Sequence, residues 1–178
     1  MTERWDIYDA HRRPTGRTMG RGEVQNPEDY RLVVSVWIRN SRGQWLISRR
    51  APSKSQPLKW EPTGGCVLAG EDSRAAALRE VREELGIDLS ACEGRLFRSL
   101  RRKEICWENP GFLDVWLFFT DFPLSAITLQ PEEVCAVRWA DEREILDLMA
   151  AGAFVPMVKF PYFRELFAEF AKIRYLTY

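Results

Sequence analysis

The segment 72–85 constrains this chain most, because it predicts an amphipathic helix that carries clustered negative charge. Its apolar residues recur at spacings of one, three and four, which is typical of a helix with one buried face. These residues are Ala77, Leu78, Val81 and Leu85. Asp72 or Ser73 is expected to cap the start of this helix, and Gly86 lies where a helix-ending glycine belongs.

The acidic side of this helix indicates a cation site. Glu80, Glu83 and Glu84 are three and four residues apart, so they project from one side of the helix. Such like-charged pairs destabilise a helix by about 0.2–0.5 kcal/mol each, unless water or a cation screens them. Mg²⁺ takes oxygen ligands, and one or two carboxylates suit it. The alternative is a solvated acidic face, in which Arg79 and its basic neighbours pair with the glutamates.

The surrounding pattern favours the cation site. Gly65, Glu71 and the run 79–87, read Arg-Glu-Val-Arg-Glu-Glu-Leu-Gly-Ile, match the pattern GX5EX7REUXEEXGU at every specified position, where U is aliphatic. Residues 65–87 therefore resemble the Nudix box, a loop–helix–loop segment. The resemblance implies an α+β fold of the Nudix type, an α/β/α sandwich around a mixed β-sheet.

The resemblance also implies an activity, which is hydrolysis of a diphosphate linkage by water. Mg²⁺, or Mn²⁺ in its place, is the implied cofactor. The implied metal-binding positions are Glu80, Glu83, Glu84, Glu71 and the Gly65 carbonyl. The implied catalytic side chains are Glu83, Glu84 and Arg79. The general base in this family is either a box glutamate or one in a later loop, and the candidates for the later one here are Glu132 and Glu133.

The rest of the chain predicts a mixed order of strands and helices. Strands are expected at 32–38, 44–48, 63–67, 96–106, 113–120 and 134–139, and helices at about 142–150 and 162–173. Residues 49–62, with three prolines, are expected to form a basic loop, and residues 1–30 an extension with a short hairpin. This order predicts a sheet flanked by helices within one domain, 1–178.

Residues 42–65 suggest a particular branch of the family. They resemble isopentenyl-diphosphate isomerase and its hydrolase-like relatives. In that branch the basic residues before the box are expected to contact the substrate diphosphate, because guanidinium and ammonium groups bind phosphate. These residues are Arg49, Arg50, Lys54 and Lys59. An isomerase is the weaker reading, because Gly64 lies where its catalytic cysteine belongs and His11 is the single histidine.

Charge and cysteine content limit the partners. The chain has 26 basic and 26 acidic residues, so nothing in its net charge predicts binding to duplex nucleic acid or to an anionic membrane. No apolar run approaches the roughly 20 residues of a membrane span. Four widely spaced cysteines are expected to be free thiols in the reducing cytoplasm. The expected partner is a small diphosphate, with a homodimer and a non-catalytic nucleotide-binding module left as open alternatives.

Overall fold

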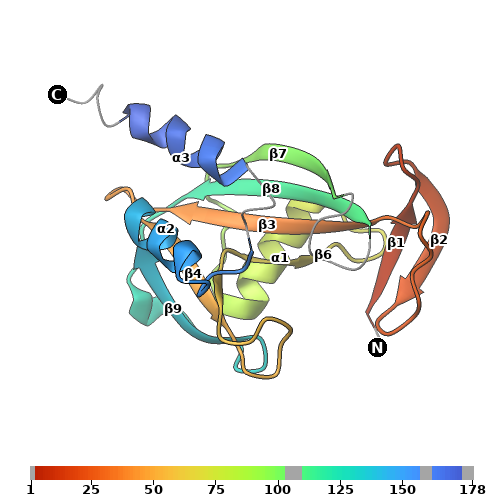
Figure 1. The fold of residues 1–178 in the computed structure, drawn as a ribbon, viewed down its shortest axis with the longest axis horizontal. Helices are drawn as coiled ribbons and strands as arrows, with labels where there is room; N and C mark the ends of the chain where they lie inside the picture. The colour runs from red at the N-terminus through yellow and green to blue at the C-terminus, as the bar shows by residue number, and fades with distance from the viewer. Residues whose placement is uncertain (1–2, 103–109, 157–161, 174–178) are drawn as a thin grey trace.

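The computed structural model describes residues 3–102, 110–156 and 162–173, and its centre is a mixed β-sheet with helices on both faces (Figure 1). The strands are β1 (Arg4–Tyr8), β2 (Pro14–Gly20), β3 (Arg31–Arg39), β4 (Trp45–Arg50), β5 (Trp60–Glu61), β6 (Thr63–Cys66), β7 (Gly94–Arg102), β8 (Gly111–Phe119) and β9 (Val134–Ala140). The helices are α1 (Ser73–Leu85), the short 3₁₀ turn η1 (Leu124–Ala126), α2 (Glu142–Ala150) and α3 (Tyr162–Ile173).

Strand β3 organises the sheet. One of its edges pairs in parallel with β8, which in turn pairs with β7. Its other edge is shared between two antiparallel partners, because β6 pairs with residues 33–36 and β4 joins only at the Arg39–Trp45 pair. Strand β4 continues away from β3 and pairs with β5 and β9. Residues of β6 and of the β4–β5 connection line the same cavity.

Two separate cores confirm the predicted α/β/α layering. Side chains of β3 alternate between the faces of the sheet, as the strand geometry requires. Val34 and Val36 pack with Val81 and Leu85 of α1 on one face. Trp37 packs on the other face with residues of α2 and α3, and its ring meets that of Phe167 edge to face at 5.7 Å. None of the described helices is long and apolar enough to cross a membrane.

The ends of the acidic helix are fixed as predicted. The Asp72 carboxylate accepts a hydrogen bond from the Ala75 backbone N–H at 2.8 Å, so Asp72 is the N-cap. Gly86 adopts a left-handed conformation with φ of 69°, and its N–H donates to the Arg82 carbonyl. Glycine reaches this conformation without the steric cost that other residues carry. The caps therefore set where α1 begins and ends, and so where its glutamates project.

Several of the predicted element boundaries were wrong. Residues 49–62 are not all loop, because β4 runs to Arg50 and the short strand β5 pairs Trp60 with Arg49. Trp60 also exchanges backbone hydrogen bonds with residues 153 and 155, a distant segment that no local pattern reveals. The strand expected at 96–106 begins at Gly94. Residues 103–109, which include positions 103–106 of the expected strand, lie outside the described residues.

The strands β1 and β2 form an antiparallel hairpin beside the start of β3 (Figure 1). Its turn carries Arg12, whose guanidinium donates to both carboxylate oxygens of Asp114 in β8 at 2.7 and 2.6 Å. Burial raises the pKa of Asp114, but hydrogen bonds from Arg12, Ser73 and Ser99 outweigh it and hold that pKa below its usual value. The ion pair therefore ties the hairpin to the central sheet.

We expect Arg12→Gln to lower the free energy of unfolding by about 3 kcal/mol at neutral pH, because it leaves the buried Asp114 charge without its partner. Asp114 has a lowered folded pKa, so its contribution is present above the unfolded pKa of about 4 and is lost as pH falls through the folded value. Urea denaturation at pH 7 and at pH 2.5 measures both effects.

The matched control for this prediction is Arg4→Gln. The Arg4–Glu23 ion pair is about half exposed on both sides, so its loss should change stability by less than about 1 kcal/mol. A stability difference between wild type and Arg12→Gln that stays constant down to pH 2.5 would contradict the assigned role of the pair.

Candidate active site

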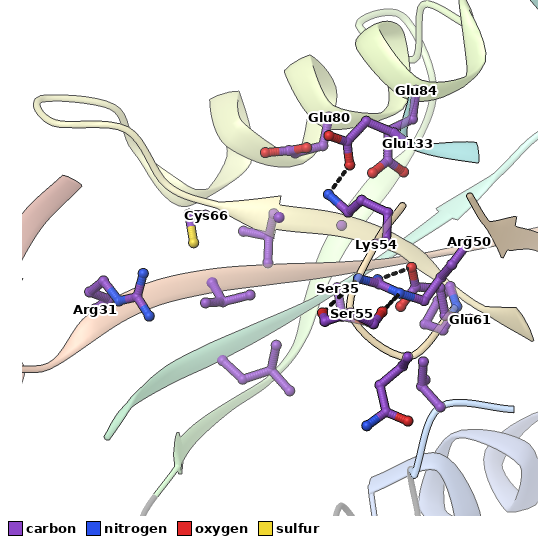
Figure 2. Close-up of a pocket in the computed structure, with 18 of the residues that line it drawn as sticks. Arg31, Ser35, Arg50, Lys54, Ser55, Glu61, Cys66, Glu80, Glu84 and Glu133 are labelled. Atoms are coloured by element: carbon purple, nitrogen blue, oxygen red, sulfur yellow. Dashed lines mark hydrogen bonds and ion pairs between the residues drawn. The ribbon is translucent and has the colours of Figure 1, made fainter. Parts of the chain in front are cut away.

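A cavity of about 780 Å³ opens between α1, β6 and the β4–β5 connection (Figure 2). Three of its walls carry charge. Helix α1 contributes glutamates, the end of β4 contributes Arg50 and the β4–β5 connection contributes Lys54. The hairpin and the start of β3 form the far wall. Ser35 and Tyr162 also line it, and Trp37 donates a hydrogen bond to the Tyr162 hydroxyl at 3.2 Å. The cavity therefore joins groups that are far apart in the sequence.

Arg79 is the centre of the hydrogen-bond network on α1. Its guanidinium donates to both carboxylate oxygens of Glu71 at 2.9 and 3.0 Å, and to the Cys66 carbonyl at 2.9 Å. Its Nη1 atom also donates to Glu80 and Glu83, at 2.9 Å each. Burial lowers the pKa of Arg79, but its bonds to Glu71 and the charge of Glu80 raise it above the usual value. Arg79 thus orients three carboxylates of the box.

Glu71 is placed to hold Arg79. One of its oxygens accepts from Arg79 Nε and the other accepts from both Arg79 Nη2 and the Leu68 backbone N–H at 3.0 Å. Both oxygens are therefore engaged within the protein.

The carboxyl groups of Glu80 and Glu84 are largely removed from water, and this burial raises the pKa of each. Burial raises the pKa of Glu80 to about 7, although Arg79 acts in the opposite direction. Burial and the charges of Glu80, Glu61 and Glu133 raise the pKa of Glu84 well above its usual value. Glu84 is 8% exposed, and its side chain makes no hydrogen bond with any described residue. A buried carboxylate of this kind is unfavourable unless a cation compensates it.

These residues fit a divalent cation by their chemistry. They supply carboxylate oxygens and an excess of negative charge, which suit Mg²⁺. Within residues 3–102, 110–156 and 162–173, no three acidic, histidine or cysteine side chains are already grouped as ligands of one ion. One or two protein carboxylates, with water and substrate oxygens as the other ligands, is the arrangement that Mg²⁺ commonly adopts.

Two adjacent glycines of β6 allow close approaches on its two sides, Gly65 to α1 and Gly64 to β3. A β-carbon at Gly65 would lie 2.6 Å from Oε2 of Glu80, so any side chain there would displace this carboxylate. A β-carbon at Gly64 would lie 3.1 Å from the Ser35 Cα and still closer to the Val34 carbonyl oxygen. Position 64, where an isomerase would need its cysteine, therefore has no room for a side chain unless β3 moves.

The structure brings two of the four basic candidates to the cavity. Lys54 forms an ion pair with Glu133, and Arg50 forms one with Glu61 and donates to the Ser55 carbonyl at 2.6 Å (Figure 2). Arg49 and Lys59 are not among the lining residues. Of the two base candidates, Glu133 lines the cavity, whereas Glu132 is exposed and does not.

Several cavity residues were not predicted from the sequence. Glu61 lies opposite Glu84, and burial raises its pKa while the charge of Arg50 lowers it. Trp5 and Arg31 form the far wall, and Tyr162 lines the cavity from α3. For Glu61 the sequence offered a signal, because this glutamate lies only four residues before Gly65, the first residue of the box. No local sequence pattern indicated that Tyr162 lines the cavity.

An α/β/α sandwich that presents a row of helix glutamates to a polar cavity is the arrangement of a Nudix-fold protein. The chain belongs to the Nudix family, because the NUDIX domain model matches residues 29–159. A protein of Listeria monocytogenes, named as an uncharacterised Nudix hydrolase, is 39% identical over 156 residues, which cover 86% of this chain and 89% of the relative.

A solved structure and an isomerase are also similar. A crystal structure of a Deinococcus radiodurans protein superposes with a TM-score of 0.70 at 28% identity, covering 85% of this chain and 91% of that one. An isopentenyl-diphosphate Delta-isomerase of Shigella flexneri is 28% identical over 149 residues, covering 82% of this chain and 81% of the isomerase. The isomerase is thus the more distant relative, in keeping with the glycine at position 64.

Proposed function

We propose that this protein is a Mg²⁺-dependent hydrolase that cleaves the diphosphate linkage of a nucleoside diphosphate derivative or a related organic diphosphate, with Mn²⁺ as the alternative ion. The observation that carries this proposal is Glu84, a buried carboxylate without a hydrogen bond to any described residue, beside the carboxylates of Glu80, Glu61 and Glu133. This concentration of negative charge, with Arg50 and Lys54 at the same cavity, suits a cation and a phosphate together.

The proposed roles of the residues follow from their contacts. Glu80, Glu83 and Glu84 hold the ion, and Arg79, itself held by Glu71, fixes the directions of Glu80 and Glu83. A bound Mg²⁺ would polarise the phosphoryl oxygens and lower the pKa of the attacking water. Lys54 binds a phosphate as a point charge, and Arg50 supports the loop that presents Lys54. Gly65 leaves the space that the Glu80 carboxylate occupies.

Glu133 is our candidate for the general base, because it lines the cavity beside Glu84. We expect Glu133→Gln to lower kcat by about 10²–10³-fold, the usual contribution of a positioned base, and to change the acid limb of the pH–rate profile. The adjacent Glu132→Gln is the matched comparison. If Glu132→Gln shows the larger loss instead, the assignment of Glu133 is wrong.

The proposed function is tested by a phosphate-release screen. Purified protein is incubated with nucleoside diphosphate derivatives, isoprenoid diphosphates and diphosphate-linked cofactors, in Mg²⁺ and in EDTA. Metal-dependent release from one class supports the hydrolase and names its substrate class. No turnover in the whole panel, together with thermal stabilisation by one of these compounds, would favour the non-catalytic nucleotide-binding module.

A further inference from the structure

The cavity has a second cationic end, formed by Arg31 at the start of β3. Arg31 lines the cavity on the side away from Arg50 and Lys54, and Figure 2 shows the two groups at opposite ends. Its guanidinium makes no ion pair or hydrogen bond with any described residue, in contrast to Arg50, Lys54 and Arg79. A partly buried guanidinium at a cavity wall with no acidic partner is available to an anionic ligand.

The hairpin holds this guanidinium in place. Arg31 lies over the Trp5 ring, 4.9 Å from its centroid, and this contact favours one position of a flexible side chain. Trp5 is itself 5% exposed and packs with Ile7 and Met19 of the hairpin. Arg21, the other basic group of this wall, is already paired with Glu3 at 2.5 Å. Among the residues that the structure describes, Arg31 therefore provides an uncompensated positive charge at this end.

The spacing along β3 separates this charge from the proposed hydrolytic centre. Val34 pairs with Gly65, which lies directly against the Glu80 carboxylate. Arg31 is three residues earlier on the strand, roughly 10 Å at the usual rise of a β-strand. Lys54 lies beside Glu84 and Glu133, whereas Arg31 lies at the other end of the cavity, so the two are placed for two different anionic groups of one ligand (Figure 2).

We propose that Arg31, braced by Trp5, is a phosphate subsite, and that the preferred substrate is an organic diphosphate that carries a further phosphate group beyond the cleaved linkage. This inference rests on the proposed function for the location of the cleaved diphosphate. Arginine suits such a subsite because its planar guanidinium can bind two phosphate oxygens at once. The hairpin would thereby select the substrate as well as support the sheet.

Matched ligand pairs that differ by a single phosphate group test this inference. NADPH and NADH form one pair, and coenzyme A and dephospho-coenzyme A form another. The readout is the ratio of kcat/KM values within each pair in Mg²⁺, and for a pair that is not hydrolysed the ratio of Kd values from calorimetry. We expect a preference of at least about tenfold for the more phosphorylated member of one pair, since a charge-assisted bond is worth this much.

The variants separate Arg31 from other effects. Arg31→Gln should reduce the preference to within about twofold, Arg31→Lys should retain part of it, and Arg95→Gln, on an exposed pair with Glu169, should leave it unchanged. Equal handling of both members of every pair, or a preference that survives Arg31→Gln, would overturn the subsite. If the protein binds the more phosphorylated ligand more tightly in a way that depends on Arg31, but hydrolyses neither ligand, the subsite is supported and the proposed hydrolase activity is contradicted.

Discussion

Glu84→Gln should lower kcat for the diphosphate substrate by at least about 10³-fold, because it removes the most buried of the helix glutamates from the proposed metal site. The same variant should not destabilise the metal-free protein. The folded pKa of Glu84 is raised, so its ionisation opposes folding as pH rises above the unfolded value of about 4.3. Glutamine removes this charge, and we expect a melting temperature at pH 8 in EDTA that is equal to or higher than that of wild type.

The control for this pair of effects is Glu93→Gln, a change at an exposed glutamate away from the cavity. It should leave both kcat and the melting temperature unchanged. Turnover of Glu84→Gln close to the wild-type value would remove Glu84 from the hydrolytic site. A lower melting temperature in EDTA would show that the carboxylate stabilises the fold, which is contrary to its surroundings.

Arg79→Leu should lower the free energy of unfolding by about 3–5 kcal/mol, because it leaves Glu71, Glu80 and Glu83 without their shared cation. It should also lower kcat strongly at temperatures where the variant is folded, since the directions of these carboxylates would no longer be fixed. Arg79→Lys keeps the positive charge but loses the bidentate hydrogen bonding to Glu71. Its losses of stability and of kcat should therefore be smaller than those of Arg79→Leu. Urea denaturation and steady-state kinetics measure the two effects separately.

A double-mutant cycle shows whether Glu71 acts through Arg79. If Glu71 mainly holds the guanidinium, Arg79→Leu combined with Glu71→Leu should be less destabilising than the sum of the single variants. Strict additivity of the two stability changes would contradict this coupling.

The parts of the fold that were predicted correctly are those with local sequence signals. The apolar spacing and caps of 72–86 located α1, and the β-branched run at 32–38 located β3. The layered α+β arrangement followed from the order of these elements and from the resemblance of the box. The position of Glu80, Glu83 and Glu84 on one helix also follows from spacing alone, which is why the candidate site was visible in the sequence.

The parts that escaped prediction depend on contacts between distant segments. Arg12 pairs with Asp114, 102 residues away, and Tyr162 reaches the cavity from α3. No local pattern distinguishes Arg50, which lines the cavity, from its neighbour Arg49, whose Nε donates instead to the Leu58 carbonyl at 2.9 Å. Adjacent strand residues point to opposite faces, so a one-residue difference decides which arginine reaches the site.

The most direct test of the central claim, that the helix glutamates hold a divalent ion, is a Mn²⁺ titration followed by electron paramagnetic resonance. Wild-type protein should bind Mn²⁺, with Mg²⁺ competing, and Glu84→Gln should bind it at least about tenfold more weakly, while Glu93→Gln binds it as wild type does. Equal Mn²⁺ affinity in wild type and Glu84→Gln, or no binding by wild type with or without the diphosphate substrate, would contradict the account.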